Sequence, residues 1–287
     1  MTISGFTIIR NGIKLDYPFI EAIMSVLPLC DEFVISIGQC EDETEKLIQS
    51  IQNEKIKIIH SPWNLENRVK GTELAIQTNI ALKHLKGDWC FYIQGDEVLP
   101  EGYNDVIINA CKEYLNNSLV EGFVFNYVHF YGNYEYEAIG RDWYRNEIRL
   151  FRNFKGIYSY GDAQGFRIDN RKLNCKKLEV PIYHYGHVRK PEGYKNKNLE
   201  MSKMWHSDSE IAAKFDSSKP FIYENKQLLR VFKGKHPEIM NKRISELNWQ
   251  FVYDPKSVRQ SLRKKILNQF EILTGIRLFE YKNFKII

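Results

Sequence analysis

Short apolar runs alternate with segments of helical periodicity through the first 115 residues, and this alternation limits the possible folds more than any other feature. The apolar runs predict strands at 6–9, 33–37, 56–59 and 89–93. The periodic segments predict helices at 19–27, 42–51 and 74–85. Strands that alternate with helices in this way build a parallel sheet from βα units, so we expect an α/β fold. The run at 89–93 is entirely apolar, which predicts a central strand buried on both faces.

The second half of the chain has a different sequence pattern. Further strands are expected at 122–130, 148–151 and 180–185, whereas 191–255 is polar and weakly patterned. An amphipathic helix that ends at Gly275 is predicted by apolar residues at helical spacing: Val258, Leu262, Ile266, Phe270 and Leu273. We therefore expect a mixed, mostly parallel sheet flanked by helices over 1–220, followed by a helical C-terminal extension at 221–287.

Charge is distributed unevenly along the chain. The net charge is +5, but residues 256–287 hold eight Lys/Arg and two Glu, which leaves about −1 on the first 255 residues. A nearly neutral body is not the electrostatic footprint of a nucleic-acid-binding protein. The five cysteines are scattered and have no CxxC spacing, so neither a disulfide framework nor a cysteine zinc site is expected.

No apolar run approaches the roughly 18 to 20 residues of a membrane-spanning helix, and no secretory leader pattern opens the sequence. We therefore expect a cytoplasmic protein. The basic helix near the C-terminus leaves two interpretations open. It fits peripheral contact with anionic lipid at the inner face of the membrane, and it equally fits a helix packed on the domain or on another subunit.

Ligands of an open parallel sheet bind outside the carboxyl ends of its strands, so the residues at those ends are the candidates for a site. No GxGxxG or GxxxxGK[ST] motif follows any predicted strand, which removes the Rossmann dinucleotide and P-loop classes. What remains is an acidic rim: Glu41, Asp42, Asp96 and Glu97. Carboxylates next to a phosphorylated ligand suit a bridging Mg²⁺ or Mn²⁺ ion, although Gly95-Asp96 is also an ordinary turn sequence.

Four motifs occur in a characteristic order over about residues 3–190. They are Ile8-Ile9-Arg10-Asn11, the strand 31–36 with the turn Glu41-Asp42-Glu43-Thr44, the helix segment 77–82 that contains Asn79, and Gly87-Asp88-Trp89 running into Gln94-Gly95-Asp96-Glu97. In this order the chain resembles the inverting GT-A glycosyltransferases of family 2, particularly those of the bacterial surface-polysaccharide type.

The resemblance implies a GT-A fold that binds a nucleotide diphosphate sugar in 1–115 and an acceptor in 116–220. It places the donor near Arg10, Asn11, Glu41, Asp42, Asn79, Gln94 and Gly95. It also implies Mn²⁺ or Mg²⁺ at Asp96, with His184 from the cluster Tyr183-His184-Tyr185-Gly186-His187 on the metal or diphosphate. Two positions depart from the family pattern, because Gln94 replaces the first acid of the DxD-like element and Ile37-Gly38-Gln39 lacks the acid that usually ends the second strand.

An inverting transfer needs a carboxylate that deprotonates the acceptor hydroxyl. Relatives place this acid about ten positions after an Arg-Leu-Phe-Arg strand, so Asp162 is the nearest match, with Glu147 and Asp142 as rivals. Arg149 and Arg152 are expected to share one face of that strand and to contact the diphosphate or an anionic acceptor, unless that face is simply solvated. Asp162 after Tyr160-Gly161 also fits an ordinary turn, and His184 also fits a hydrogen-bonded structural histidine.

The sequence therefore predicts a glycosyltransferase that passes a sugar to a saccharide or lipid-linked acceptor in the synthesis of a cell-surface polysaccharide or glycoconjugate. A nucleotidyltransferase on a similar sheet is the second enzyme class, although Arg10-Asn11-Gly12 is too short for the Gly-rich basic loop that such an enzyme needs. A nucleotide-sugar-binding module that has lost catalysis is the non-enzymatic alternative, because Gln94 replaces an acid.

Overall fold

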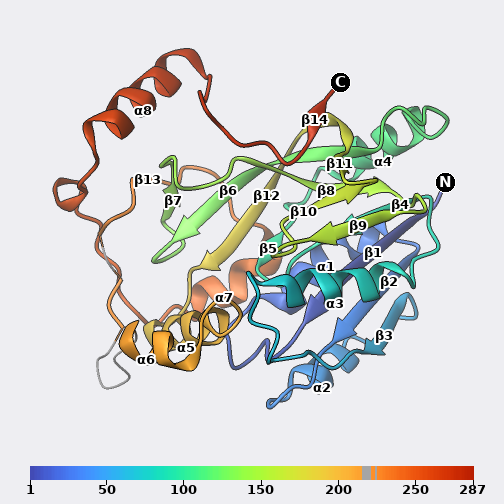
Figure 1. Cartoon of the computed structure of the whole chain (residues 1–287), viewed down its shortest axis with the longest axis horizontal. Helices are drawn as coiled ribbons and strands as arrows, with labels where there is room; N and C mark the ends of the chain where they lie inside the picture. Colours follow the sequence, from blue (N-terminus) through green and yellow to red (C-terminus); the bar gives the residue numbers. More distant parts are fainter. Residues whose placement is uncertain (215–220, 224) are drawn as a thin grey trace.

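A large mixed sheet forms the centre of the molecule, and helices cover both of its faces (Figure 1). The computed structural model describes residues 1–214, 221–223 and 225–287. In that part of the chain the sheet runs in the order β13-β7-β6-β8-β4-β1-β2-β3, with β12 beside β6 and joined to β5 and β14. A smaller sheet has the order β11-β10-β9.

The strands span β1 Ile3–Ile9, β2 Glu32–Ile37, β3 Ile56–His60, β4 Trp89–Tyr92, β5 Glu97–Val98, β6 Gly122–Tyr131, β7 Tyr136–Ala138, β8 Asn146–Arg152, β9 Ile157–Tyr160, β10 Gly165–Ile168, β11 Arg171–Lys172, β12 Asn174–His187, β13 Leu229–Val231 and β14 Lys285–Ile286. The helices span α1 Phe19–Val26, α2 Thr44–Gln49, α3 Thr72–Leu82, α4 Asn104–Glu113, α5 Pro191–Ser202, α6 Asp208–Lys214, α7 Asn241–Ser245 and α8 Leu262–Thr274. Short 3-10 turns occupy Leu27–Leu29, Glu238–Met240 and Pro255–Ser257.

The first half of the sheet is built from parallel βα units. Strands β3, β2, β1 and β4 are parallel neighbours, and β8 then runs antiparallel to both β4 and β6. Strand β12 restores a parallel pairing with β6. The predicted α/β class, with a mixed sheet flanked by helices, is confirmed.

Strand β4 lies at the centre of the core, as its apolar sequence predicts. Trp89 and Phe91 pack with side chains of α1 and α4 on one face of the sheet. Cys90 and Tyr92 pack on the other face, with side chains of α3 and with Phe166 of β10. All four residues of β4 are buried. Packing on both faces therefore holds the strand in place, and it fixes the position of the turn that follows the strand.

Three helix starts differ from the sequence prediction by a few residues, and α3 begins at Thr72 rather than at residue 74. Helix α2 begins at Thr44 with Glu43 as its N-cap, because Asp42 accepts hydrogen bonds from the backbone N–H of Lys14 at 2.7 Å and from that of Thr44 at 3.0 Å. Helix α8 begins at Leu262, capped by the Ser261 hydroxyl, since the preceding residues form a 3-10 turn. It ends at Gly275, whose φ of +69° is the left-handed conformation expected of a glycine there.

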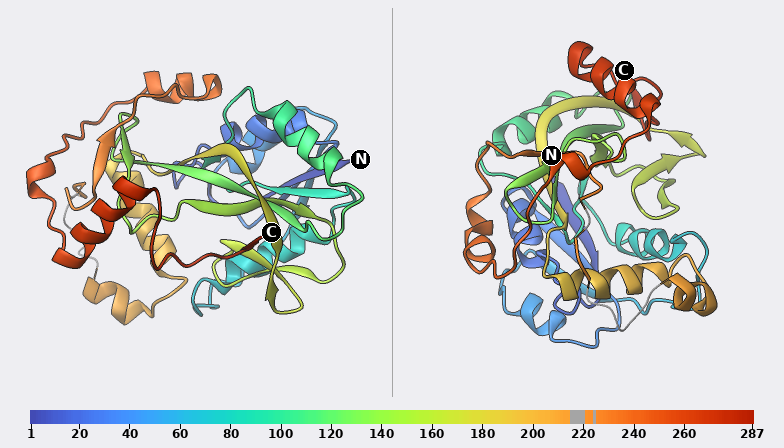
Figure 2. Two further views of the ribbon diagram at one scale, coloured as in Figure 1. Left: turned by 90° about the horizontal axis from the view of Figure 1, so that it is seen from above. Right: turned by 90° about the vertical axis from the view of Figure 1, so that its left-hand side faces the viewer.

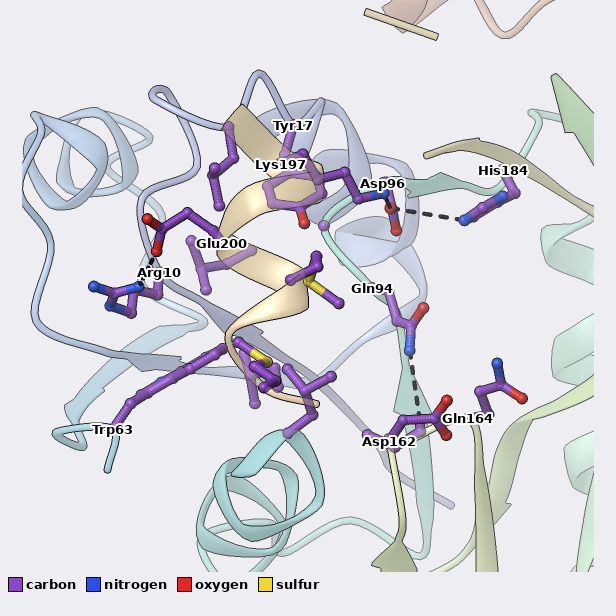
Figure 3. Close-up of a pocket in the computed structure, with 18 of the residues that line it drawn as sticks. Arg10, Tyr17, Trp63, Gln94, Asp96, Asp162, Gln164, His184, Lys197 and Glu200 are labelled. Atoms are coloured by element: carbon purple, nitrogen blue, oxygen red, sulfur yellow. Dashed lines mark hydrogen bonds and ion pairs between the residues drawn. The ribbon is translucent and has the colours of Figure 1, made fainter. Parts of the chain in front are cut away.

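The polar region after residue 190 carries the element that matters most for the site. Helix α5 follows β12 and brings its side chains across the carboxyl ends of β1 and β4 (Figure 3). The predicted domain boundary at residue 220 lies outside the described residues, and the chain beyond it returns to the large sheet as β13 and β14. None of the helices in the described ranges has the length and apolar content needed to cross a bilayer.

Candidate active site

Two adjoining cavities lie at the carboxyl ends of the parallel strands, and Figure 3 shows residues that line the first of them. The first has a volume of about 280 Å³, and its walls include Arg10, Tyr17, Gln94, Gly95, Asp96, Asp162, His184 and Lys197. The second has a volume of about 370 Å³, and its walls include Lys14, Glu41, Asn67, Arg68, Glu73 and Lys203. Both are lined by Arg10, Trp63, Glu200 and Met204, so they form two compartments of one cleft.

Asp96 stands at the end of β4 with two basic side chains beside it. Its Oδ2 atom lies 3.4 Å from Nζ of Lys197 and 3.7 Å from Nε2 of His184. Burial alone would raise the pKa of the Asp96 carboxyl, but Lys197 and His184 outweigh burial and hold that pKa well below its usual range. Asp96 is therefore a carboxylate at neutral pH, and its charge is already balanced within the protein.

Lys197 comes from α5 and was not predicted as a site residue. Its ammonium group donates to the carbonyl of Gly186 at 2.8 Å as well as facing Asp96. Burial, with Arg189 adding to its effect, lowers the pKa of Lys197 to about 8, although Asp96 opposes the shift. The polar, weakly patterned sequence of α5 gave no signal for this residue, because its position depends entirely on how the helix docks.

A buried ion pair supports the turn that carries Asp96. The Arg149 guanidinium donates to both carboxylate oxygens of Glu97, at 2.8 and 2.7 Å, and the hydroxyl of Tyr127 donates to the same carboxylate at 2.7 Å. Glu97 Oε2 also accepts the backbone N–H of Gln94 at 3.1 Å. Glu97 and Arg149 are fully buried, so this pair fixes the conformation of the turn rather than facing a ligand.

The two arginines of β8 do not share a face that lines the cleft, which corrects the sequence prediction. Arg149 turns to Glu97, whereas the guanidinium of Arg152 donates to backbone carbonyls of the segment between α4 and β6, including Leu115 at 2.8 Å and Val120 at 2.7 Å. Residues three apart do not share a strand face, and a register shift in the pairing with β6 also interrupts the alternation of β8 at Arg149. Both arginines therefore have structural partners.

Histidine side chains form a chain behind Asp96. His129 Nε2 lies 2.6 Å from the carbonyl oxygen of Tyr144, so this nitrogen carries a proton and donates. Burial, followed by the nearby His184, holds the pKa of His129 well below its usual range, so its Nδ1 atom is an acceptor. The 3.0 Å contact between the two Nδ1 atoms then requires His184 to donate. His184 consequently presents Nε2 towards Asp96.

The predicted donor-binding residues divide into two groups. Arg10 lines both compartments and contacts Glu41 at 3.2 Å and Glu200 at 3.5 Å. Gln94 and Gly95 line the first compartment, and Glu41 lines the second.

Three other predicted donor-binding residues connect segments of the backbone instead. Asn11 accepts the backbone N–H of Glu41 at 2.7 Å, and Asp42 holds the loop at Lys14. Asn79 exchanges two hydrogen bonds with the backbone of Ser159, at 2.8 and 2.7 Å, which joins α3 to β9. None of the three is among the residues that line the two described compartments.

The three candidate bases occupy different environments. Asp162 lines the first compartment, and burial raises the pKa of its carboxyl. Glu147 is buried next to Asn283, and burial raises its pKa to about 7, but it does not line either compartment. Asp142 accepts from Lys264 of α8 at 2.6 Å on the surface. Asp162 alone therefore has the access that a catalytic base needs.

The side chains around Asp96 do not fit a divalent cation. Within the described ranges no group of three His, Cys, Asp or Glu side chains is placed to hold a metal ion. Gln94 offers an amide where a second carboxylate would be needed, and Lys197 occupies the space beside Asp96 with a positive charge. Asp96, the first of the two predicted ligands, therefore pairs with an ammonium group instead.

No protein-family model matches the chain, and no curated protein matches it. Solved structures do match. The chain is 16% identical to TarS 1–349 of S. aureus with a TM-score of 0.43, over 75% of this chain and 68% of that one. The structure of the same protein in complex with UDP-GlcNAc is 15% identical to this chain, with a TM-score of 0.43. That match covers 75% of this chain and 69% of the other.

A longer S. aureus TarS structure is covered over 41% of its length. Glucosyl-3-phosphoglycerate synthase of Mycobacterium tuberculosis, in complex with Mn²⁺, UDP and phosphoglyceric acid, matches with 18% identity and a TM-score of 0.31. That match covers 45% of this chain and 43% of the other. Each of these similarities is partial and distant.

Proposed function

We propose that this protein is an inverting GT-A glycosyltransferase. It transfers a sugar from a nucleotide diphosphate sugar to a hydroxyl of a saccharide or lipid-linked acceptor, in the synthesis of a cell-surface polysaccharide or glycoconjugate. One observation carries the proposal. A two-compartment cleft at the carboxyl ends of β1 and β4 brings Asp162, with its raised carboxyl pKa, into the same cavity as the cations of Arg10 and Lys197.

The second compartment suits the nucleoside and the boundary between compartments suits the diphosphate. Trp63 and Arg10 line both spaces, and the buried Nε1 of Trp63 and Nε of Arg10 have no hydrogen-bond partner among the described residues. Buried donors without a partner are rare in folded proteins, because each costs free energy until something accepts from it. Phosphate and sugar oxygens are acceptors of the required kind.

The first compartment suits the transfer step. The Asp162 carboxylate takes the proton of the acceptor hydroxyl as that oxygen attacks the anomeric carbon of the donor. The bond from this carbon to the diphosphate breaks, and the diphosphate leaves with the bonding electron pair. Lys197 and Arg10 lie where their charges stabilise this leaving group. A carboxyl with a raised pKa is a stronger base than an ordinary aspartate, which favours Asp162 in this role.

We infer that a side chain of the protein, Lys197, supplies the positive charge that neutralises the diphosphate. The residues around Asp96 fit this ammonium group and not a divalent ion. Asp96 then has a positioning role, since it holds Lys197 in the first compartment. This revises the Mn²⁺ or Mg²⁺ site that the sequence resemblance implies.

Thermal-shift measurements with UDP-, GDP-, CMP- and dTDP-sugars test the donor, each with Mn²⁺ and with EDTA. A ligand that binds the folded state alone raises the melting temperature. We expect one nucleotide to give a shift that is equal with Mn²⁺ and with EDTA. A shift that EDTA abolishes would contradict the role of Lys197, and the absence of a shift with every donor would contradict the transferase itself.

Measuring the release of nucleoside diphosphate from the bound donor distinguishes a transferase from the two alternative functions. A transferase releases it slowly by hydrolysis and faster with an acceptor, and Asp162→Asn should suppress both rates. A binding module that has lost catalysis would bind the donor and release nothing. A nucleotidyltransferase would instead form inorganic pyrophosphate from a nucleoside triphosphate.

A further inference from the structure

Helix α8 is docked with its charged side against the protein. Glu271 contacts Arg141 at 2.8 Å, Arg277 at 2.8 Å and Arg145 at 3.3 Å, and its side chain is largely buried. Earlier in the helix, Lys264 pairs with Asp142 at 2.6 Å. Ion pairs with the protein body, rather than an apolar core, therefore contribute much of the docking of this helix.

The opposite side of α8 is apolar and faces outwards. Leu262, Ile266 and Leu273 are 74%, 60% and 75% exposed. At roughly 100° of rotation per residue they fall within about 40° of one another, and Glu271 lies about 140–180° away. We call Leu262, Ile266, Phe270 and Leu273 the outer face of α8. Figures 1 and 2 show this helix at the periphery of the molecule, beyond the large sheet.

Exposed apolar side chains continue beyond the helix. Ile276 is 57% exposed and Phe279 is 82% exposed. An amphipathic helix in a water-soluble domain normally turns such a stripe towards the core. A contiguous exposed apolar patch instead marks a surface that binds another protein or a membrane.

Positively charged residues border the outer face, and their charge indicates whether a second copy of the chain or a lipid surface covers it. Arg263 and Lys265 are exposed on its two sides, and Arg259 is exposed just before the helix. The two glutamates of this region, Glu271 and Glu280, are held in ion pairs with arginines. In a two-fold dimer through this face, like charges would meet across the interface. An anionic lipid surface complements both the apolar residues and their basic border.

We propose that α8 lies in the interface of an anionic membrane. Leu262, Ile266 and Leu273 enter the boundary between headgroups and acyl chains, and Arg263 and Lys265 contact lipid phosphates. Such a surface would keep the enzyme close to a lipid-linked acceptor. The inference does not depend on the proposed transfer reaction, because it rests on the orientation of α8 and not on the cleft.

Co-sedimentation of the full chain with vesicles tests the proposal. The vesicles are made of phosphatidylcholine alone or of phosphatidylcholine with phosphatidylglycerol. We expect binding only when phosphatidylglycerol is present, and weakening by salt, because the charge interaction is screened. Leu262→Ser/Leu273→Ser and Arg263→Glu/Lys265→Glu should each reduce the partition coefficient by about tenfold or more.

The matched control is Val106→Ser/Leu119→Ser, which removes two side chains that are 46% and 69% exposed in and after α4. It should bind vesicles like the original protein, and unchanged melting temperatures would show that all variants fold. Absence of binding to anionic vesicles, or equal binding by the outer-face variants, would overturn the proposal. A concentration-dependent dimer in sedimentation velocity that Leu262→Ser/Leu273→Ser abolishes would assign the face to a second copy instead. Donor thermal shifts on the same variants keep this outcome separate from the test of transferase function.

Discussion

Nζ of Lys197 lies 3.4 Å from Oδ2 of Asp96 and 2.8 Å from the carbonyl oxygen of Gly186. The contact joins helix α5 to the turn after β4 across 101 positions of the sequence. It places a positive charge at the edge of the sheet where the parallel strands end. The cleft therefore contains a resident cation whose position is set by a carboxylate.

Removing that cation should weaken diphosphate binding selectively. In Lys197→Met we expect a nucleoside diphosphate to bind about tenfold or more weakly, because a charged hydrogen bond to phosphate is lost. Binding of the nucleoside without phosphates should change little. Titration calorimetry with both ligands measures the difference, with Lys197→Arg as the variant that keeps the charge. An equal loss for both ligands would point to collapse of the cleft instead.

The pH dependence of transfer should have two limbs. Asp162 must be deprotonated to act as base, so kcat/KM should rise with pH through the raised pKa of this carboxyl. Lys197 must be protonated to hold the diphosphate, so kcat/KM should fall above about pH 8. Rate measurements across pH check both limbs. In Lys197→Arg the alkaline limb should move to higher pH, and an unmoved limb would rule out Lys197 as its source.

The buried pair of Glu97 and Arg149 should matter for stability. Arg149→Met leaves a carboxylate buried without its partner, which we expect to cost roughly 3–5 kcal/mol in the free energy of unfolding. Urea denaturation measures this value. Lys235→Met is the control, because Lys235 and Glu238 form an exposed pair whose loss should change the free energy of unfolding very little. Similar costs for the two substitutions would contradict the structural role of Arg149.

Glu147 should make the folded state less stable as the pH rises. Burial raises its folded-state pKa to about 7 from an ordinary value of 4.5. The folded state therefore holds a proton that the unfolded state releases, so this contribution is complete below about pH 4.5 and is lost as the pH rises to 7. Its size is on the order of 3 kcal/mol.

Glu147→Gln tests this expectation, since the amide does not titrate. Unfolding free energies measured between pH 4.5 and 7 should decline less in this variant than in the original protein. Parallel declines would show that Glu147 is ionised in the folded state and would remove it from the groups that control stability. Asp162→Asn in the same series separates the contribution of the other acid with a raised pKa.

Local sequence patterns determined much of the fold. The apolar run of β4, the alternating strands and helices before it, and the amphipathic spacing of α8 each depend on neighbouring residues. The structure contains all of these elements, with some ends shifted by a few residues. The position of Asp96 at a strand end follows from the same local pattern. Its location at the edge where ligands bind needed only the general rule for parallel sheets.

The interaction partners of the charged and polar residues could not be predicted from local sequence patterns. Arg149 was predicted to contact a diphosphate or an anionic acceptor, yet it pairs with Glu97, 52 positions away. Asn79 was predicted to contact the donor, yet it connects α3 to the backbone at Ser159. An arginine or asparagine has the same local signature whether it binds a ligand or a buried backbone group, because only burial and the neighbouring element distinguish the two.

The sequence by itself determined the α/β class, the central strand and the acid at its end, because periodicity and composition act over a few residues. The tertiary structure decided that Lys197 faces that acid, that Asp162 rather than Glu147 reaches the cleft, and that α8 turns its apolar side outwards. Each of these depends on how distant segments dock. Docking is set by the summed packing and ion pairing of surfaces that are adjacent only in the folded chain.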